Sequence, residues 1–147
     1  MKSILLTLLC VSQITYAAQI VVSGACSKTP LLKESLSFNG EISAGEFTVE
    51  SFKKFSVPFE GSVAHVASIY NSPMSLDAME VISDTKLRSH GWCFSINGVL
   101  AEKYPNEVTI KNTDTVHWFY GYASYDSGVW SGMCQPTNDI QPAQFCD

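Results

Sequence analysis

The sequence predicts one small domain in which a single helix accompanies several short strands and disulfides hold the chain ends. The chain has 147 residues, and once an expected leader of 17 is set aside the remainder is long enough for one hydrophobic core but not for two. Apolar residues recur at helical spacing in one segment and at strand spacing in several others. Four cysteines lie outside the leader, an even number.

Residues 1–17 have the pattern of a secretory signal peptide. Lys2 supplies the positive start, residues 4–11 are almost all apolar, and Ala17 ends a small-residue cleavage signal. This apolar run is too short to cross a bilayer, and no later stretch reaches the roughly 18 apolar residues that a spanning helix needs. We therefore expect cleavage after about Ala17, a secreted or periplasmic location and no membrane insertion.

The charge balance argues against two classes of partner. The chain carries 9 basic and 14 acidic residues, for a net charge of −5, and Lys2 belongs to the leader. An acidic domain without a run of Lys or Arg is not expected to bind nucleic acid or anionic membranes. The remaining candidate partners are a small-molecule ligand or an envelope or extracellular protein.

The cysteines agree with export. Cys10 lies in the leader, and the other four are expected to form two disulfides in an oxidising compartment: Cys26, Cys93, Cys134 and Cys146. Four cysteines allow three pairings. We favour Cys93–Cys134 with Cys26–Cys146, because this pairing ties both chain ends to the body of the domain.

The first half of the chain is expected to contain strands and then the helix. Residues 19–23 suggest a short strand. Residues 46–59 are rich in β-branched and aromatic side chains, with Phe55, Val57 and Phe59 at period two, and predict a long strand or a tight pair of strands. Pro58 places the end of this segment at a sheet edge.

Residues 62–70 carry the helix pattern. Ser62 is a good N-cap, and apolar residues follow it at helical spacing: Val63, Val66, Ala67 and Tyr70. The Asn-Ser-Pro segment at 71–73 would end this helix.

Turns and strands alternate in the second half. A turn at 75–77 leads to a strand at 79–82, and residues 83–89 are expected to form a loop. Residues 92–96 alternate, with Trp92 expected in the core, and Asn97 with Gly98 predicts a tight turn. Short and long strands follow at 108–110 and 115–122, and the segment after Tyr125 is expected to be an irregular tail held by the cysteines.

The long strand carries aromatic residues on both faces. His117, Phe119 and Gly121 alternate with Trp118, Tyr120 and Tyr122, although a sheet with one buried face needs large apolar side chains on that face only. These rings could all be core. Alternatively, some form a partly exposed aromatic platform for a ligand or a partner, which predicts these ligand-binding residues: Trp118, Tyr120, Tyr122, Tyr125 and Trp130.

Two motifs resemble the transcobalamin-like C-terminal domain family. The first is Gly-Trp-Cys-Phe-Ser-Ile-Asn-Gly at 91–98, similar to the family's Gly-Trp-x-Tyr-x-Val-Asn-Gly strand and turn, and its matching residues are Gly91, Trp92, Asn97 and Gly98. The second is Asn-Thr-Asp-Thr-Val-His-Trp-Phe-Tyr at 112–120, similar to Asp-Gly-Asp-x-Ile-x-Trp-x-Tyr. It departs from the family pattern where Thr113 replaces the glycine.

This resemblance covers about residues 46–125 of a single domain at 18–147. It implies an α+β, β-grasp-like fold, with a mixed sheet packed on one main helix and terminal extensions pinned by the disulfides. In the cobalamin carriers such a domain covers one face of the corrin ring, so the resemblance also implies a corrinoid as a candidate ligand.

The sequence gives less support for catalysis and for the binding of a metal or a nucleotide. There is no Gly-x-Ser-x-Gly elbow, phosphate-binding loop or dinucleotide fingerprint, and His90 with Cys93 is an isolated pair without further metal ligands nearby. Four acidic residues that could act in hydrolysis all lie beside turns: Glu102, Glu107, Asp114 and Asp126.

We therefore expect a non-catalytic module without a cofactor or metal that binds a soluble ligand. The alternatives are a protein–protein or cell-surface interaction module or inhibitor, and a small secreted hydrolase.

Overall fold

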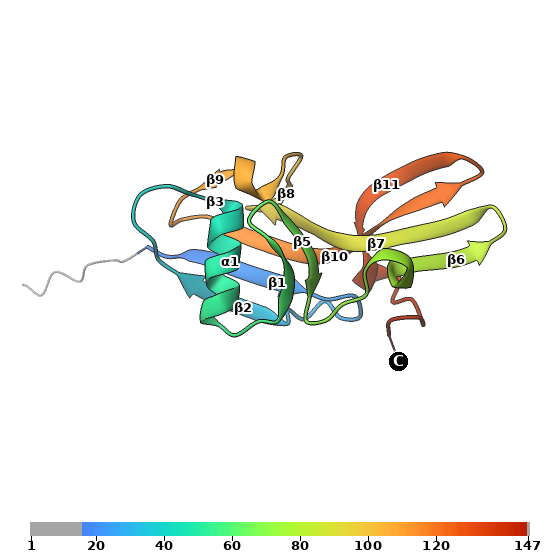
Figure 1. Cartoon of the computed structure of the whole chain (residues 1–147), viewed down its shortest axis with the longest axis horizontal. Coiled ribbons are helices and arrows are strands. Elements are labelled where there is room, and N and C mark those ends of the chain that lie inside the picture. Colours follow the sequence, from blue (N-terminus) through green and yellow to red (C-terminus); the bar gives the residue numbers. More distant parts are fainter. Residues whose placement is uncertain (1–15, 147) are drawn as a thin grey trace, which may run out of the picture.

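The computed structural model describes residues 16–146, so most of the expected signal peptide lies outside the described residues. The domain has the α+β fold that the sequence predicts, with a mixed sheet, one main helix and two disulfides (Figure 1). Among the described residues, no helix is long and apolar enough to cross a membrane.

The main sheet is built around two long central strands, β7 and β10. The strand order is β2 (Leu32–Leu36), β1 (Ala18–Ser23), β10 (Thr115–Asp126), β7 (Lys86–Ile96) and β6 (Met79–Ser83). Two further strands join it, β8 (Val99–Leu100) beside β7 and β11 (Val129–Pro136) beside β10. β1 and β10 run parallel while the other neighbours are antiparallel, which makes the sheet mixed.

The remaining elements are short. The structure contains α1 (Ala44–Lys54), two small strand pairs and three 3₁₀ turns: β3 (Ile42–Ser43) with β9 (Thr109–Ile110), β4 (Phe59–Ser62) with β5 (His65–Ile69), η1 (Ser75–Ala78), η2 (Pro105–Glu107) and η3 (Thr137–Asp139).

The helix is not where the periodicity predicted it. Residues 46–59 were expected to be strand, but α1 occupies most of this segment because Ser43 and Glu46 form a capping box. Ser43 Oγ accepts from Glu46 N at 3.1 Å, and Glu46 Oε2 accepts from Ser43 N at 2.9 Å. Apart from Gly45, the buried residues of α1 recur at helical spacing and include polar ones, which obscured the pattern: Ala44, Phe47, Thr48, Ser51 and Phe52.

The segment predicted as a helix is instead the β4–β5 hairpin. Ser62 Oγ accepts from Ala64 N at 3.3 Å, so this side chain closes the turn between the two strands and does not cap a helix. Val66 and Ser68 are buried at period two, as expected for a strand with one covered face.

Two other expectations need correction. The segment at 83–89 is not a loop, since β7 begins at Lys86 after a two-residue turn. The segment after Tyr125 is not irregular throughout, because β11 pairs with β10 across Ser127 and Gly128, whose positive φ values of 50° and 97° suit a tight hairpin. The turn at Asn97 and Gly98 is confirmed, with φ values of 53° and 81°.

The core lies between the sheet and the layer formed by α1 and the β4–β5 hairpin. Phe47 and Phe52 of α1 pack in one cluster with Ile20 of β1 and Trp118 of β10. Trp92 is only half-buried, packs at the edge of this cluster and donates from Nε1 to Ser72 Oγ at 2.7 Å. Beyond α1 the long strands continue as an arm, made of β6, β11 and the adjoining ends of β7 and β10, which extends away from the helix in Figure 1.

Candidate functional site

The two long strands present one covered face and one more open face. We call the open side the outer face, and its cross-strand pairs are Gly91 with Gly121, Cys93 with Phe119, and Ser95 with His117. The opposite, inner face carries the alternating residues that pack under α1, β5 and the C-terminal tail, residues 137–146.

Two of the predicted platform residues belong to the core. Trp118 is 2% exposed and donates from Nε1 to Thr48 Oγ1 at 2.9 Å, while Tyr120 is 1% exposed and donates from its hydroxyl to Pro73 O at 2.7 Å. Burial raises the pKa of Tyr120 to about 12. These two rings stabilise the inner face and do not form a surface platform.

The other three predicted residues lie in the arm. Trp130 on β11 is 50% exposed, and its ring packs on Tyr125 with the centroids 5.2 Å apart. Tyr122 is half-buried, with the Arg88 guanidinium 5.4 Å from its ring centroid. The aromatic surplus in this part of the chain is therefore divided between core and surface.

A first groove of about 460 Å³ lies between the paired strands and β11. Exposed Trp130 and Met133 line it from β11, and the Cys93–Cys134 disulfide lies at its border. Tyr122, His90 and Trp92 line it as well, and the other residues between these walls are small: Ser89, Gly91, Gly121 and Ala123.

The two glycines in the groove differ in the space around them, so glycine is present at these two positions for different reasons. A Cβ at Gly121 would lie 3.2 Å from Cys93 Sγ and 3.2 Å from Gln135 O, so a side chain there would be crowded unless the disulfide or β11 shifts by a few tenths of an ångström. A Cβ at Gly91 would have no atom within 4 Å apart from those of its own residue and its two chain neighbours, and Gly91 is not among the glycines with positive φ. Neither packing nor backbone conformation explains Gly91, whose effect is to leave the backbone open to the groove.

The other motif residues have structural roles. Asn97 Oδ1 accepts from Thr115 N at 2.9 Å, and Asn97 Nδ2 donates to Asp114 Oδ1 at 2.9 Å. These bonds tie the turn at Gly98 to the start of β10. Asn97 therefore holds the hairpin in place and lies outside the groove.

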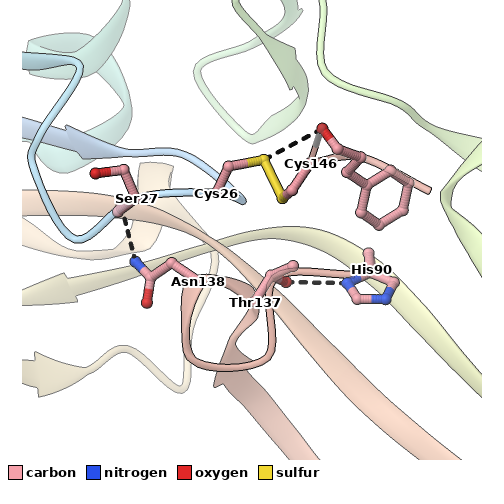
Figure 2. Close-up of a disulfide and its surroundings, with 7 residues drawn as sticks. Cys26, Ser27, His90, Thr137, Asn138 and Cys146 are labelled. Carbon is pink, nitrogen blue, oxygen red and sulfur yellow. Dashed lines mark hydrogen bonds between the residues drawn. A yellow bond between two sulfur atoms is a disulfide. The ribbon is translucent and has the colours of Figure 1, made fainter. Parts of the chain in front are cut away.

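Both predicted disulfides are present. Cys26 pairs with Cys146 across 120 residues, and Cys93 pairs with Cys134 across 41. Figure 2 shows the first bridge beside the tail, where Asn138 Nδ2 also donates to Ser27 O at 3.3 Å. The bridge between Cys93 and Cys134 connects β7 to β11 across the intervening strand β10, next to Gly121.

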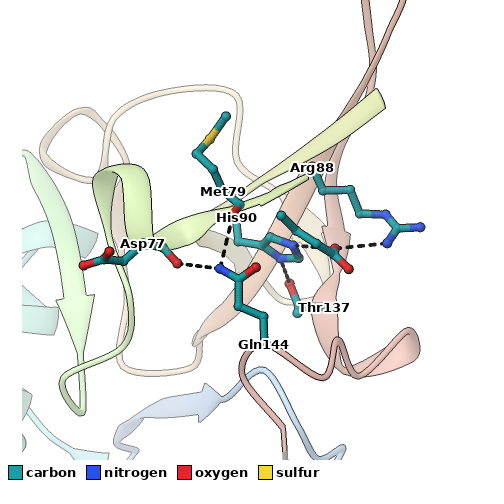
Figure 3. A network of polar contacts seen from close by, with 7 residues as sticks. Asp77, Met79, Arg88, His90, Thr137 and Gln144 are labelled. Carbon is teal, nitrogen blue, oxygen red and sulfur yellow. Dashed lines mark hydrogen bonds and ion pairs between the residues drawn. The ribbon is translucent and has the colours of Figure 1, made fainter. Parts of the chain in front are cut away.

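A partly buried polar network that the sequence did not predict surrounds His90 (Figure 3). His90 Nδ1 lies 2.9 Å from Thr137 Oγ1, and Nε2 lies 3.2 Å from Glu80 Oε2, which also accepts from Arg88 at 3.0 Å. Burial lowers the pKa of His90, and the hydrogen bond and charge of Glu80 oppose this shift. Because a carboxylate only accepts, neutral His90 donates from Nε2 to Glu80 and accepts the Thr137 hydroxyl at Nδ1.

A second groove, of about 410 Å³, lies on the outer face on the other side of Cys134. Ser23 Oγ and His117 Nε2, which lie 2.9 Å apart, line it together with the half-buried ring of Phe119. The sequence offered no signal for this pair, because parallel strands bring together residues that are 94 positions apart.

Three of the four acidic residues that are candidates for catalysis, Glu107, Asp114 and Asp126, have local partners. Asp126 pairs with Lys86 at 3.0 Å, and Glu107 accepts from Tyr104 N at 3.1 Å. Cys93 is bonded to Cys134 and is not free to bind metal. Within residues 16–146, no group of three His, Cys, Asp or Glu side chains is arranged to hold a metal ion.

Comparison with known proteins does not identify a family. No family model matches the chain, and no curated protein matches it. The resemblance to the transcobalamin-like domain family therefore stays a prediction.

One solved structure, described as a "putative metal binding protein" from Ruminococcus gnavus ATCC 29149, is similar with a TM-score of 0.49 and 12% sequence identity, covering 72% of this chain and 96% of that chain. The metal binding in that description applies to the neighbour and is not transferred to this chain.

Proposed function

We propose that this protein is an exported, non-catalytic binding module whose first groove takes a small, flat, apolar ligand. The observation that carries the proposal is Gly91. This glycine leaves the middle of a long strand uncovered, at a position where an added Cβ would have no atom within 4 Å apart from those of its two chain neighbours. Glycine inside a strand costs stability, and one recognised reason for it is the close approach of a ligand to the backbone.

The walls of the groove suit such a ligand. Trp130 and Met133 present apolar surface at the rim, and the described residues that line the groove include no Lys, Arg, Asp or Glu. Its volume falls within the range of about 300–1,000 Å³ typical of small-ligand pockets. Stacking on one ring contributes about 1 kcal/mol beyond the apolar area buried.

Export is supported by two features. The first 17 residues have the composition of a signal peptide, and two disulfides that close long loops persist in oxidising compartments. The corrinoid named by the sequence resemblance is larger and more polar than such a ligand, so it is tested as the alternative ligand. A neutral naphthylamine dye serves as a general probe of apolar grooves.

The test is binding to the wild-type protein and to Gly91→Leu. Binding of hydroxocobalamin would be measured by equilibrium dialysis with corrin absorbance, and binding of N-phenyl-1-naphthylamine by its fluorescence. We expect saturable binding of at least one ligand that Gly91→Leu abolishes and Trp130→Ala weakens. Ser35→Leu, on exposed β2, adds a similar apolar side chain away from the groove and should bind as the wild type does.

Two results would reject this proposal. One is the absence of saturable binding of both ligands at millimolar concentration. The other is binding that Gly91→Leu leaves unchanged while its melting temperature shows that the variant is folded.

The arm supports a second candidate function, recognition of another protein. Val81 on β6 is 77% exposed, and Val129 and Met133 on β11 are exposed as well, although both strands lie at sheet edges. A protein partner would lose affinity in Val81→Asp, a position outside the first groove, whereas this variant should still bind the dye.

A further inference from the structure

The second groove gathers polar side chains from separate parts of the chain. Ser23 ends β1, Ser95 lies on β7 and His117 on β10, while Asn138 and Asp139 belong to η3 in the C-terminal tail. Ser23 and Ser95 are both buried as residues although they line the groove. Convergence of a few polar groups in one concave site is typical of ligand recognition.

These side chains supply both hydrogen-bond donors and acceptors. The Ser23 hydroxyl and the His117 ring lie 2.9 Å apart, which orients each toward the other at the groove wall. The Asn138 amide nitrogen donates to Ser27 O at 3.3 Å, which holds that side chain in place. Hydroxyl, imidazole, amide and carboxylate groups together match a ligand whose own groups both donate and accept, as hydroxyls do.

The charges of the groove are balanced. Lys28 Nζ lies 2.8 Å from Asp139 Oδ1, so the cation at the rim already has an anionic partner. Burial lowers the pKa of His117, which favours the neutral ring at pH 7. The groove therefore offers no uncompensated cation to a phosphate or a carboxylate.

Phe119 adds an apolar surface among these polar groups. Its ring is half-buried on the outer face, 5.7 Å from the ring of His117, and Leu100 and Pro136 complete the apolar lining. One aromatic ring surrounded by neutral donors and acceptors suits a molecule that has a C–H face and a rim of hydroxyls.

We infer that the second groove binds a neutral, hydroxyl-rich ligand of the class of mono- and disaccharides. Phe119 stacks on the C–H face of a sugar ring, while Ser95, His117 and Asn138 bond its hydroxyls. This site is separate from the first groove, which is lined by other residues apart from the shared Cys134.

The experiment uses the three histidines as reporters in NMR spectra of the oxidised protein at pH 7.5. N-acetyl-D-glucosamine, D-glucose and maltose are titrated separately into the high-millimolar range. We expect a saturable shift of the His117 ring signals with at least one sugar. His65, exposed on β5, and His90, buried on the inner face, should not move.

Two variants test the mechanism. Phe119→Leu keeps apolar volume but removes the ring, and it should weaken sugar binding about fivefold. Ser95→Ala removes one hydroxyl and should also weaken binding. Gly91→Leu, which fills the first groove, should leave sugar binding unchanged, so the two sites succeed or fail independently.

Three outcomes would overturn the inference. His117 could fail to shift with any of the sugars, or all three histidines could shift equally, which indicates a bulk effect. Sodium phosphate could shift His117 as strongly as the best sugar, which indicates an anion site. The signals of His65 and His90 establish in each variant that the fold is intact, so a null result counts against the sugar site.

Discussion

His90 Nδ1 lies 2.9 Å from Thr137 Oγ1 inside the domain, where β7 meets the first turn of the C-terminal tail. The His90 side chain is completely buried, and the ring of Phe145 packs edge-on against it with the centroids 4.8 Å apart. Gln144 Nε2 donates to Asp77 O at 2.8 Å (Figure 3). The tail is thus held by hydrogen bonds and an aromatic contact as well as by the Cys26–Cys146 bridge.

Stability should fall as the pH drops below about 6.5. Burial lowers the pKa values of His90 and His117 below the ordinary 6.5, so the unfolded chain binds more protons than the folded chain in this window. The contribution of both residues is complete above pH 6.5 and is lost as the pH falls through that value toward their folded pKa values. Melting temperatures between pH 7.5 and 5 should show this decline, and His90→Asn should make it shallower. A melting temperature that stays constant across this range would contradict the prediction.

The two disulfides should stabilise the fold but affect binding differently. They span 120 and 41 residues, and loss of each should cost about 2–4 kcal/mol in the free energy of unfolding. The double variant Cys93→Ser with Cys134→Ser should also lose dye binding, since this bridge borders the first groove. Cys26→Ser with Cys146→Ser is the control, and at a temperature where it is folded it should retain dye binding. Equal loss of binding in both double variants would indicate an effect of stability alone.

Two buried hydroxyls on α1 should respond oppositely to removal. Ser51 Oγ has no hydrogen-bond partner among the described residues, so Ser51→Ala should raise the free energy of unfolding by about 1 kcal/mol. Thr48 Oγ1 donates to Ala44 O at 2.7 Å and accepts from Trp118 Nε1. Thr48→Val should lower the free energy of unfolding by about 1–3 kcal/mol, because the Trp118 donor loses its partner. Urea denaturation of both variants measures the difference, and a stabilising Thr48→Val would refute this account.

The paired glycines should also respond oppositely to alanine. Gly91→Ala places a methyl group in open space and should be neutral or stabilise the fold by up to about 1 kcal/mol. Gly121→Ala crowds Cys93 Sγ and Gln135 O and should destabilise it by about 1–3 kcal/mol. Thermal unfolding of the two variants compares them directly. A destabilising Gly91→Ala would show that the residue has a structural role, and the first groove would lose its main support.

The strands that the sequence predicted well are those with strong local signals. Alternation around Trp92 predicted part of β7, and Asn97 with Gly98 predicted the turn after it, because a tight turn with positive φ accepts few residue types. Three disulfide pairings were possible, and the one favoured because it ties both chain ends to the body of the domain is confirmed. The helix was missed because Thr48 and Ser51 occupy buried positions where the pattern expected apolar residues, while Val63, Val66 and Tyr70 matched helical spacing in a hairpin.

The candidate sites were predicted only in part. Trp130 and Tyr122 were found from the surplus of aromatic residues and both line the first groove, whereas Trp118 and Tyr120 could not be assigned to the core without knowing which face α1 covers. Gly91 was recognised as part of a motif. That it leaves the backbone open to the first groove could not be predicted, because the groove depends on the position of β11. The pairing of Ser23 with His117 depends on a parallel contact between strands far apart in the sequence, which local patterns do not encode.

The Cys93–Cys134 bridge lies between the two grooves, and Cys134 contributes to the wall of each. If the protein is exported and binds ligands as proposed, both grooves would take their final form only after this bridge has formed in an oxidising compartment.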